Sequence, residues 1–417
     1  MASLSDLPDD IVYEIVSHIR DRKMLREISL LSRKFKIPSS VFLYRRVCGG
    51  PHTLYHFKRT ISERPELAKY VKQVCLRFEP AVVWSRHGNP ENSVRSDLGS
   101  VKQTTKCLGF HDEYAMVNNL LPLLTCLEDF QLIIKSRPKF VFLATGDRAK
   151  EPDAVIDNGH LSTLKKLRKL NIQVRGTRNG PYRIDLLPLL QLPSLQKFFA
   201  MGIRISDGFE LPTTSKITSL YLVGSVLESC NRKMFRCCRT LESFTYRPRH
   251  RSDSELEAKL GAKPREIVEA LDPVTSTLKR LRLNYWNGPR YDLDFWRNGY
   301  DVDHLTGPLH KFENLTTLQV DSATLLGAFG SENVPSLTSL LPKKITSLEI
   351  NCWGFHDRQQ LIGLSKECTS GFGELREVRI FGVSHSIYFA YPRCEFPRHV
   401  KFDFSYCEPV YYEEGLT

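Results

Sequence analysis

The sequence has no apolar run of the ~18 residues that a membrane-spanning helix needs, and its first residues are polar and acidic, unlike a signal peptide. It also has no Cys-x-x-Cys spacing. The 11 cysteines are an odd number, which fits reduced, buried thiols better than disulfides or a zinc site. Their one cluster, Cys230, Cys237 and Cys238, lacks a second ligand pair and is expected in the core. We therefore expect an intracellular protein, cytoplasmic or nuclear, with no membrane contact and no metal.

Short catalytic motifs are also missing. The sequence contains no Gly-x-Gly-x-x-Gly, no Gly-x-x-x-x-Gly-Lys-Ser/Thr, no His-Glu-x-x-His and no Gly-x-Ser-x-Gly. His52 and His56 are one helical turn apart, but Gly49–Pro51 keeps Cys48 off that helix as a third metal ligand. Two carboxylate pairs within 292–303 lack supporting groups. The sequence thus predicts a non-catalytic protein without a cofactor, and an enzyme hidden in the insertions is an alternative.

Basic residues outnumber acidic ones but are scattered along the chain. The 59 Lys and Arg against 47 Asp and Glu give a formal charge of +12, which suits an acidic or phosphate-bearing partner. The densest clusters, at 165–169 and 247–251, are more typical of solvated faces or loops than of nucleic-acid sites. We therefore expect a protein partner and no nucleic acid.

The first 47 residues read as short amphipathic helices. Asp6 can cap a helix whose first turn holds Pro8, and a second helix is expected after a cap at Asp21. Pro38 is expected to stop this second helix or a short third one. Apolar residues recur at helical spacing in both helices: Ile11, Val12, Ile15, Val16 and Ile19, then Leu25, Ile28 and Leu31. Helices of this size bury too little surface alone, so a partner surface is expected.

This stretch resembles an F-box. The order of features carries the resemblance: Leu7-Pro8, Ile11 and Ile15, Met24-Leu25 and Ile28, then Leu31-Ser32-Arg33-Lys34-Phe35. Phe35 stands where Trp is commoner, and Ser32 where Cys is common. The resemblance implies docking on the Skp-type adaptor of a cullin ligase through Leu7, Pro8, Ile11, Ile15, Leu25, Ile28, Leu31 and Phe35. The alternative is an ordinary helical cap of a larger domain.

The rest of the chain repeats one pattern, apolar-x-x-apolar-x-apolar. It recurs eleven times, ending at Leu76, Leu132, Ile172, Ala200, Leu222, Tyr246, Leu283, Val320, Ile350, Ile380 and, with a Pro in the first position, Phe402. Beyond the first gap the repeats average about 30 residues, near the 20 to 29 of leucine-rich repeats. A short strand and a return segment in each repeat must stack on neighbouring layers to bury the apolar side chains.

The pattern resembles leucine-rich repeats, but it is degenerate, and the lead-in Pro65–Val71 resembles the start of the repeat region in fungal F-box proteins. The Asn or Cys expected three residues after each last apolar position is missing, so no side-chain ladder of hydrogen bonds is predicted. Insertions are expected at 79–119, 137–160, 247–275 and 286–312. The fold class is α/β, with an F-box (1–47), a linker helix (48–65), a leucine-rich-repeat-like solenoid (66–407) and a tail (408–417). The alternative is a set of unrelated strands in one or two α/β domains.

Residues between the apolar positions of each strand point to the other face of the sheet and form the second predicted site. Aromatic and arginine side chains dominate protein interfaces, and neighbouring arginines suit an acidic or phosphorylated peptide. The candidates for target binding are Phe199, Tyr221, Arg247, Arg280 and Arg282. The acidic residues Glu349, Asp321 and Asp403 share that face and reduce its basic excess, and a solvated face without a ligand is an alternative.

The two resemblances together imply the substrate-recognition subunit of a Skp/cullin/F-box ubiquitin ligase. The F-box would bind the adaptor, and through it the cullin, while the solenoid presents a target protein to the ubiquitin-conjugating enzyme. Such a subunit acts by proximity and needs no catalytic group of its own. An F-box scaffold that acts without ubiquitination is the alternative.

Overall fold

The computed structural model describes most of the chain in twelve stretches. These are residues 6–78, 117–134, 163–175, 182–184, 187–205, 214–227, 232–248, 262–285, 305–327, 335–353, 358–382 and 396–406. The chain packs into two compact units, Met1–Leu167 with Ile172–Gly180, and Arg168–Asn171 with Pro181–Thr417. Most of the predicted insertions, the carboxylate pairs in 292–303, Cys230 and the tail lie outside the described residues.

The first unit begins with three helices that share a core of their own, here called the head (residues 6–45). They are α1 (Asp9–Ser17), α2 (Arg22–Leu31) and α3 (Arg33–Arg45). Val12, Val16, Leu25 and Phe35 are buried together, and Leu7, Ile19, Ile28, Phe42 and Leu43 pack against them. The carboxylate of Asp21 accepts a hydrogen bond from the Lys23 backbone (2.9 Å), so the predicted cap of α2 is confirmed.

Two predictions about helix ends in the head are wrong. Helix α1 starts at Asp9, where Pro8 is the N-cap and makes no side-chain cap, so Pro8 is not within its first turn. Pro38 stops neither helix, because it lies inside α3, which continues to Arg45. The break between α2 and α3 is made by Ser32, whose hydroxyl accepts a hydrogen bond from the Lys34 backbone (3.1 Å).

The chain leaves the head through a strand that the sequence did not predict. Strand β1 (Arg46–Gly49) pairs in parallel with β2 (Gln73–Phe78), which pairs in parallel with β3 (Asp129–Ile134). Between them lie α4 (Pro51–Glu63), the 3₁₀ turn η2 (Pro65–Tyr70) and, before β3, η3 (Leu121–Leu123). Helix α4, within the predicted linker helix, buries Leu54, Phe57 and Ile61, which recur at helical spacing. The sheet therefore begins before α4, across the predicted boundary between the F-box (1–47) and the linker helix (48–65).

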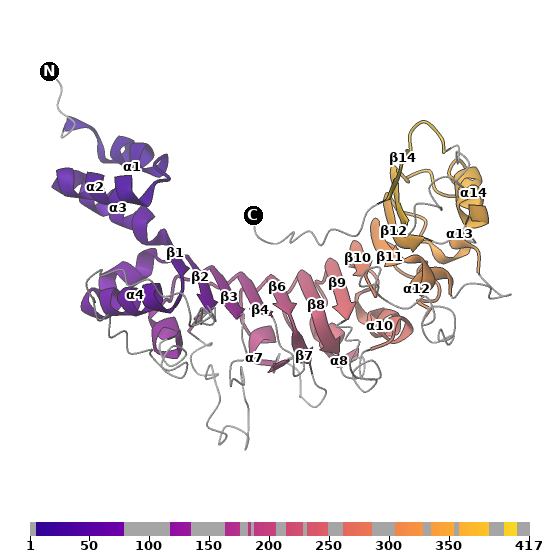
Figure 1. Ribbon diagram of the computed structural model, residues 1–417, viewed down its shortest axis with the longest axis horizontal. Helices are drawn as coiled ribbons and strands as arrows, with labels where there is room; N and C mark the ends of the chain where they lie inside the picture. Colours follow the sequence, from indigo (N-terminus) through magenta and orange to yellow (C-terminus); the bar gives the residue numbers. More distant parts are fainter. Residues whose placement is uncertain are drawn as a thin grey trace, which may run out of the picture. The chain divides into compact units, whose positions relative to one another are not determined.

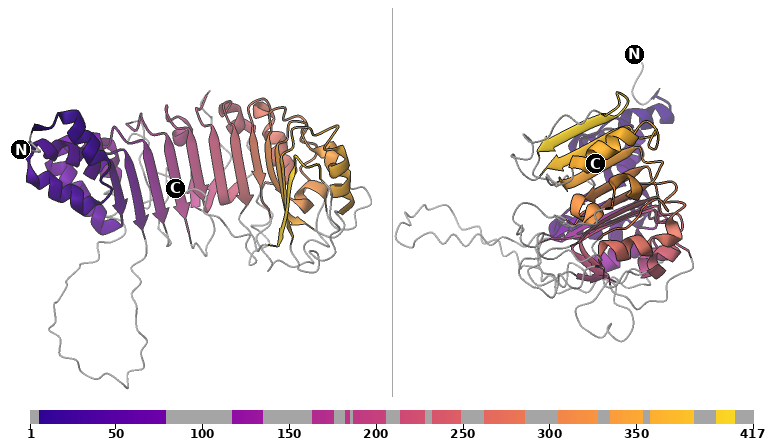
Figure 2. Two further views of the ribbon diagram at one scale, coloured as in Figure 1. Left: turned by 90° about the horizontal axis from the view of Figure 1, so that it is seen from above. Right: turned by 90° about the vertical axis from the view of Figure 1, so that its right-hand side faces the viewer.

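Parallel strands in chain order form the second unit. Strand β4 (Lys169–Val174) has residues in both units. The hydrogen-bonded order then runs along the sheet (Figure 2) through β6 (Lys197–Met201), β8 (Ser219–Leu227), β9 (Ser243–Pro248), β10 (Arg280–Leu283), β11 (Thr317–Asp321), β12 (Ser347–Trp353), β13 (Glu377–Gly382) and β14 (Lys401–Tyr406). Strands β5 (Tyr182–Ile184) and β7 (Ile203–Ile205) pair beside this path, and β7 also pairs with β8.

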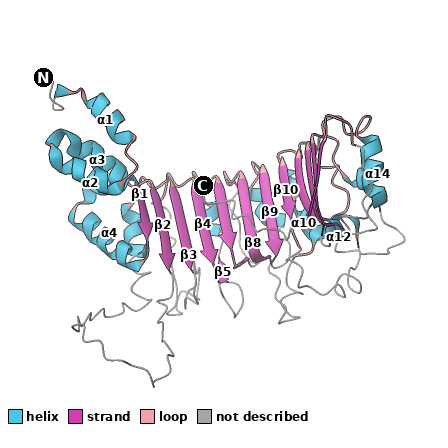
Figure 3. Cartoon of the chain, turned by 45° about the horizontal axis from the view of Figure 1, so that its top comes forward, coloured by secondary structure: helices cyan, strands magenta, loops and turns pink. Residues whose placement is uncertain are grey.

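Short helices lie on one side of these strands, as Figures 1 and 3 show. They are α7 (Leu187–Leu190), α8 (Arg232–Cys237), α10 (Pro264–Ala270), η5 (Asp272–Val274), α12 (Ser322–Leu326), α13 (Leu337–Leu340) and α14 (Arg358–Glu367). The apolar residues of each strand point to this side. Phe244, Leu281, Leu318 and Leu348, which are register neighbours, have no exposed surface. We call the other side of β6–β14 the open face.

The predicted register holds from β6 to β13 and fails at β14. Phe199, Tyr221, Thr245, Arg282, Gln319, Glu349 and Arg379 form one continuous row, as the repeat pattern predicts. The partner of Arg379 is Asp403 rather than Lys401, and Phe402 and Phe404 align with Val378 and Ile380. The last triplet was therefore assigned two residues too early, because Val400 and Phe402 imitate the spacing.

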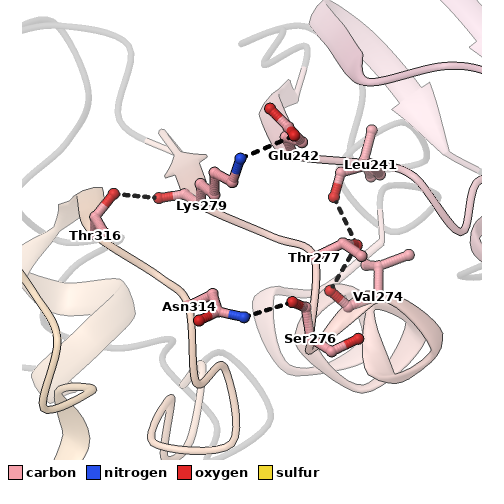
Figure 4. Close-up of polar contacts among 8 residues, drawn as sticks. All are labelled: Leu241, Glu242, Val274, Ser276, Thr277, Lys279, Asn314 and Thr316. Carbon is pink, nitrogen blue, oxygen red and sulfur yellow. Dashed lines mark hydrogen bonds and ion pairs between the residues drawn. The ribbon is translucent and has the colours of Figure 1, made fainter.

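A ladder of backbone hydrogen bonds marks the point where each strand begins. The carbonyl of Glu242 accepts from the amides of both Lys279 (2.8 Å) and Arg280 (2.9 Å), and that of Lys279 from both Thr316 (2.9 Å) and Thr317 (3.0 Å). The same double acceptance continues in the next two layers. Threonine hydroxyls reinforce it, for example from Thr316 to the Lys279 carbonyl (3.1 Å; Figure 4). The ladder is therefore supplied mainly by backbone, at the amino end of the strands.

Candidate functional site

Exposed apolar side chains are concentrated in the head. Nine large apolar side chains are exposed among the described residues, and seven of them belong to α1–α3: Ile11, Tyr13, Ile15, Met24, Leu30, Leu31 and Ile37. The other two, Tyr55 and Leu123, also lie in the first unit. Exposure is largest at Leu30 (79%) and Leu31 (75%). A concentration of this kind on so small a bundle is typical of a protein-interaction surface.

The predicted adaptor-binding residues divide into exposed and buried groups. Ile11, Ile15, Leu31 and Pro8 are exposed, and Leu7 and Ile28 are partly buried against the head core. Leu25 (3% exposed) and Phe35 (6%) lie inside that core. The structure therefore assigns Leu25 and Phe35 to holding the three helices together, and leaves the exposed members available for contact.

Four exposed large apolar residues of the head were not among the predicted contacts. Leu30 neighbours Leu31, Tyr13 lies between Ile11 and Ile15 in sequence, Met24 precedes Leu25 in α2, and Ile37 lies in the first half of α3. The one signal in the sequence was that these apolar residues fall outside the helical stripes that form the core. An apolar residue of this kind can be assigned to the exposed surface only after the helical stripe that forms the core is known.

The second and third helices also carry an excess of positive charge. Seven basic residues and one acidic residue, Glu27, lie within α2 and α3. Arg22 donates hydrogen bonds to the carbonyls of Leu43 (3.2 Å) and Arg46 (3.3 Å), so it ties α2 to the end of α3 and the start of β1. Arg26, Arg33 and Lys36 are exposed next to the apolar side chains. The exposed surface of α2 and α3 is therefore both apolar and basic, whereas α1 carries three exposed acidic residues, Asp9, Asp10 and Glu14, and no lysine or arginine.

In the second unit, the open face joins aromatic and basic side chains. Phe199 and Tyr221 are half-buried register neighbours whose rings stack with centroids 6.3 Å apart and planes at 30°. Thr245 and then Arg282 continue this row, and Arg280 lies two residues before Arg282 on the same strand. Arg247 lies two residues beyond Thr245 on β9. The structure thus brings the five predicted target-binding residues together on β6–β10.

Charge on the open face is separated by strand. Strands β6, β8, β9 and β10 place four basic side chains and no acidic ones there: Lys197, Arg247, Arg280 and Arg282. Strands β11–β14 place three acidic and two basic ones there: Glu349, Glu377, Asp403, Arg379 and Lys401; Asp321, at an open-face position of the register, is buried. The acidic residues therefore do not share the strands of the arginine cluster.

The acidic side chains of β11–β13 are engaged locally. Glu349 accepts a hydrogen bond from the Gln319 amide (2.6 Å), and Glu377 from Arg379 (2.8 Å), with Lys401 at 3.6 Å. The hydrogen bond with Glu377 raises the pKa of Arg379. Asp321 is fully buried and accepts from the backbone of Tyr285. These contacts keep the acidic groups from neutralising Arg280, which is exposed and has no polar partner among the described residues.

Comparison with protein families gives a match for the repeats of the second unit. Residues 152–366 match the family model described as a leucine-rich repeat domain, which is just over half of the sequence. The chain belongs to the leucine-rich repeat family. No curated protein matches it. The leucine-rich repeat match begins well after the head, for which no F-box model is matched.

The leucine-rich repeat match includes β6–β12 and hence the aromatic and basic side chains of the open face. Stacked repeats form extended surfaces that bind other proteins.

No group of three or more metal-ligating side chains lies in the described stretches, and no helix there is long and apolar enough to cross a membrane. The rings of His52 and His56 meet edge-to-face at the exposed surface of α4, with their Nε2 atoms 3.3 Å apart, and no third ligand lies nearby in those stretches.

Three cysteines of the repeats, Cys237, Cys238 and Cys368, are buried in the apolar core. Cys237 and Cys238 are buried beside Leu241, and burial raises the pKa of the Cys238 thiol to about 12. Cys368 is also buried, which raises the pKa of its thiol to about 11. A raised pKa keeps these thiols protonated at neutral pH, so they lack the thiolate that nucleophilic or metal chemistry requires.

Proposed function

We propose that this leucine-rich repeat protein is the substrate-recognition subunit of a Skp/cullin/F-box ubiquitin ligase. The head, by its resemblance to an F-box, docks on the Skp-type adaptor, and the open face of the repeats binds a target protein. The chain carries no catalytic group in this proposal. It holds a target lysine near the thioester of the ubiquitin-conjugating enzyme and so raises its effective concentration.

The observation that carries the proposal is the distribution of exposed apolar side chains. A three-helix head that leaves Leu30 and Leu31 more than 70% exposed loses the free energy that their burial would provide, about 1.5–3 kcal/mol for each side chain. A helix-rich adaptor that covers Ile11, Ile15, Leu30 and Leu31 recovers it. The basic residues of α2 and α3 near Leu30 and Leu31 favour an adaptor surface that is acidic at this point, and predict that association weakens as salt increases.

The test is co-purification of the full-length chain with a Skp-type adaptor. Leu30→Asp with Leu31→Asp should abolish adaptor recovery, because two carboxylates would lose their hydration at the interface without a partner. The head should stay folded, since both side chains are largely exposed. The matched control is Ser62→Asp, which adds a carboxylate at an exposed position of α4 outside the head and should leave recovery unchanged.

Unchanged adaptor recovery with the double variant, while circular dichroism shows both proteins folded, would reject the F-box assignment. Ubiquitin transfer separates the proposal from its alternative. Target proteins captured by the intact chain should accumulate on proteasome inhibition if the complex is a ligase. They should not change in abundance if the chain is a scaffold that uses the adaptor for assembly alone.

A further inference from the structure

The open face of β6–β10 has the composition of a peptide-binding surface. We call the side chains of this region the aromatic–basic face: Lys197, Phe199, Met201, Ser219, Tyr221, Val223, Ser243, Thr245, Arg247, Arg280 and Arg282. It contains four positive charges, two stacked aromatic rings and two further apolar side chains, and no acidic group. Aromatic and arginine residues supply most of the energy of protein interfaces.

We propose that this face binds an acidic segment of a partner protein that also carries an aromatic or large aliphatic anchor. The anchor lies against Phe199 and Tyr221, and carboxylate or phosphate oxygens accept charge-assisted hydrogen bonds from Arg280 and Arg282. The inference deepens the proposed function, because the partner it describes is the target that the ligase would recruit.

The geometry of the sheet sets the spacing within that segment. Tyr221 on β8 and Arg282 on β10 are in the same row, two strands apart. Neighbouring strands are about 4.8 Å apart, so the two side chains are separated by about 10 Å across the sheet. An extended peptide advances about 3.3 Å per residue. A segment that crosses the strands therefore places its acidic residue about three positions from its anchor.

A second row of residues on the open face leaves room for the bound peptide segment. Lys197, Ser219, Ser243 and Arg280 are successive register neighbours across β6–β10. The two serines are short and almost fully buried (5% and 4% exposed), whereas Lys197 and Arg280 at the ends of the row are long and exposed. The row is therefore low in the middle and positively charged at both ends, which favours a chain with acidic residues at each side.

The distribution of charge favours a peptide over a nucleic acid. The adjoining strands β11–β14 carry a net negative charge on the same face, with Glu349 two strands from Arg282. A nucleic acid has a phosphate at every nucleotide, so it would meet this acidic region wherever it extended past β10. A peptide can confine its acidic residues to the part that lies over Arg280 and Arg282.

The experiment uses the full-length chain and an array of synthetic 14-residue peptides on a Gly-Ser background. Each peptide carries one Tyr and a pair of Glu residues, separated by one to six positions, and parallel series replace the Glu pair with phosphoserine or with Gln. Binding should be strongest when the anchor and the first acidic residue are about three positions apart. The Gln series should not bind. Stronger binding of the phosphoserine series would identify a phosphorylated target, and equal binding an acidic one.

The best peptide is then measured by fluorescence anisotropy with variants. Arg280→Gln and Arg282→Gln should each weaken binding at least tenfold, and Tyr221→Ala about tenfold, because each removes a group that contacts the peptide. The control is Lys401→Gln, which removes a positive charge from the acidic region of the same face, beside Glu377, and should change affinity less than twofold. Thermal unfolding checks that the variants stay folded.

Three outcomes would overturn the inference: no binding to any peptide of the array, equal binding of the Gln series, or a single-stranded oligouridine that binds more tightly than the best peptide. The assay contains no adaptor. Its failure therefore leaves the adaptor test of the head unaffected, and a failure of the adaptor test leaves the peptide measurement interpretable.

Discussion

The head and the leucine-rich repeats treat apolar side chains in opposite ways. The head buries four of them, Val12, Val16, Leu25 and Phe35, and leaves seven large ones exposed. None of the exposed large apolar side chains in the described stretches belongs to the second unit. The repeats are completed by their own neighbouring layers, whereas the head, in the proposed function, is completed by another protein.

The largest effect is expected from Phe244→Ala in the repeats. Phe244 has no exposed surface, and the centroid of its ring lies 5.1 Å from that of Phe235 and 6.5 Å from that of Tyr246. Its truncation should lower the free energy of unfolding by about 3–5 kcal/mol, measured by urea denaturation. Thr245→Ala on the open face is the control and should have little effect. If hydrogen exchange in α1–α3 increased with Phe244→Ala, the two regions would not be independent.

A smaller effect that is confined to the head is expected from Leu25→Ala. With only four side chains in its core, the head should lose about 2–3 kcal/mol, and hydrogen exchange in α1–α3 should increase while β6–β14 stays protected. Leu30→Ala, at a position 79% exposed on the same helix, is the control and should leave exchange unchanged. Saturating adaptor should restore protection to Leu25→Ala, because binding stabilises the folded head. Increased exchange in the repeats would contradict the comparison.

Alkaline pH should act on the repeats through Cys238. Folding raises the pKa of this thiol from 9.0 to about 12, so the folded state binds the proton more tightly than the unfolded state. The stability that depends on the neutral thiol is complete below pH 9 and decreases as pH rises towards 12. Between pH 8 and pH 10 the unfolding free energy should fall by about 1 kcal/mol more than in Cys238→Ala. Identical pH profiles for the two proteins would show that this thiol does not contribute.

The smallest effect should come from Ser32→Ala, which removes the cap between α2 and α3. The serine hydroxyl accepts a hydrogen bond from the Lys34 backbone, and loss of such a cap costs about 1 kcal/mol. Thermal unfolding followed by circular dichroism should show the head transition at a lower temperature. Ser32→Asp, which can accept the same hydrogen bond, should restore it. A loss that Ser32→Asp does not restore would point to packing instead of capping.

The repeat pattern predicted strand positions well because alternation is strict in a half-buried strand. The row from Phe199 to Arg379 follows directly from it. Strand β1 was missed because it has one buried residue, Val47, and owes its position to pairing with β2. The register of β14 was ambiguous, since Val400, Phe402 and Phe404 fit two settings of a period of two.

The candidate sites were predictable in position but not in detail. Helical spacing located the head surface, yet it could not separate the buried Leu25 and Phe35 from the exposed Leu30 and Leu31, because all four are apolar and the difference depends on how the helices pack. On the open face, Arg280 and Arg282 were identified, but the separation of charge by strand required the register of eight strands. The carbonyl ladder is made mainly by backbone groups, and the threonines that reinforce it, Thr218, Thr316 and Thr346, were not recognised in the sequence as its signature.

That carbonyl ladder explains how the repeats tolerate unequal length. Each new layer is anchored by one main-chain oxygen of the previous layer, whether 22 residues separate the two, as for Gln196 and Thr218, or 37, as for Lys279 and Thr316. A return segment can thus lengthen, shorten or change in composition without disturbing the height at which the next layer starts. Evolution can therefore change the return segments freely, while the amino ends of the strands stay aligned.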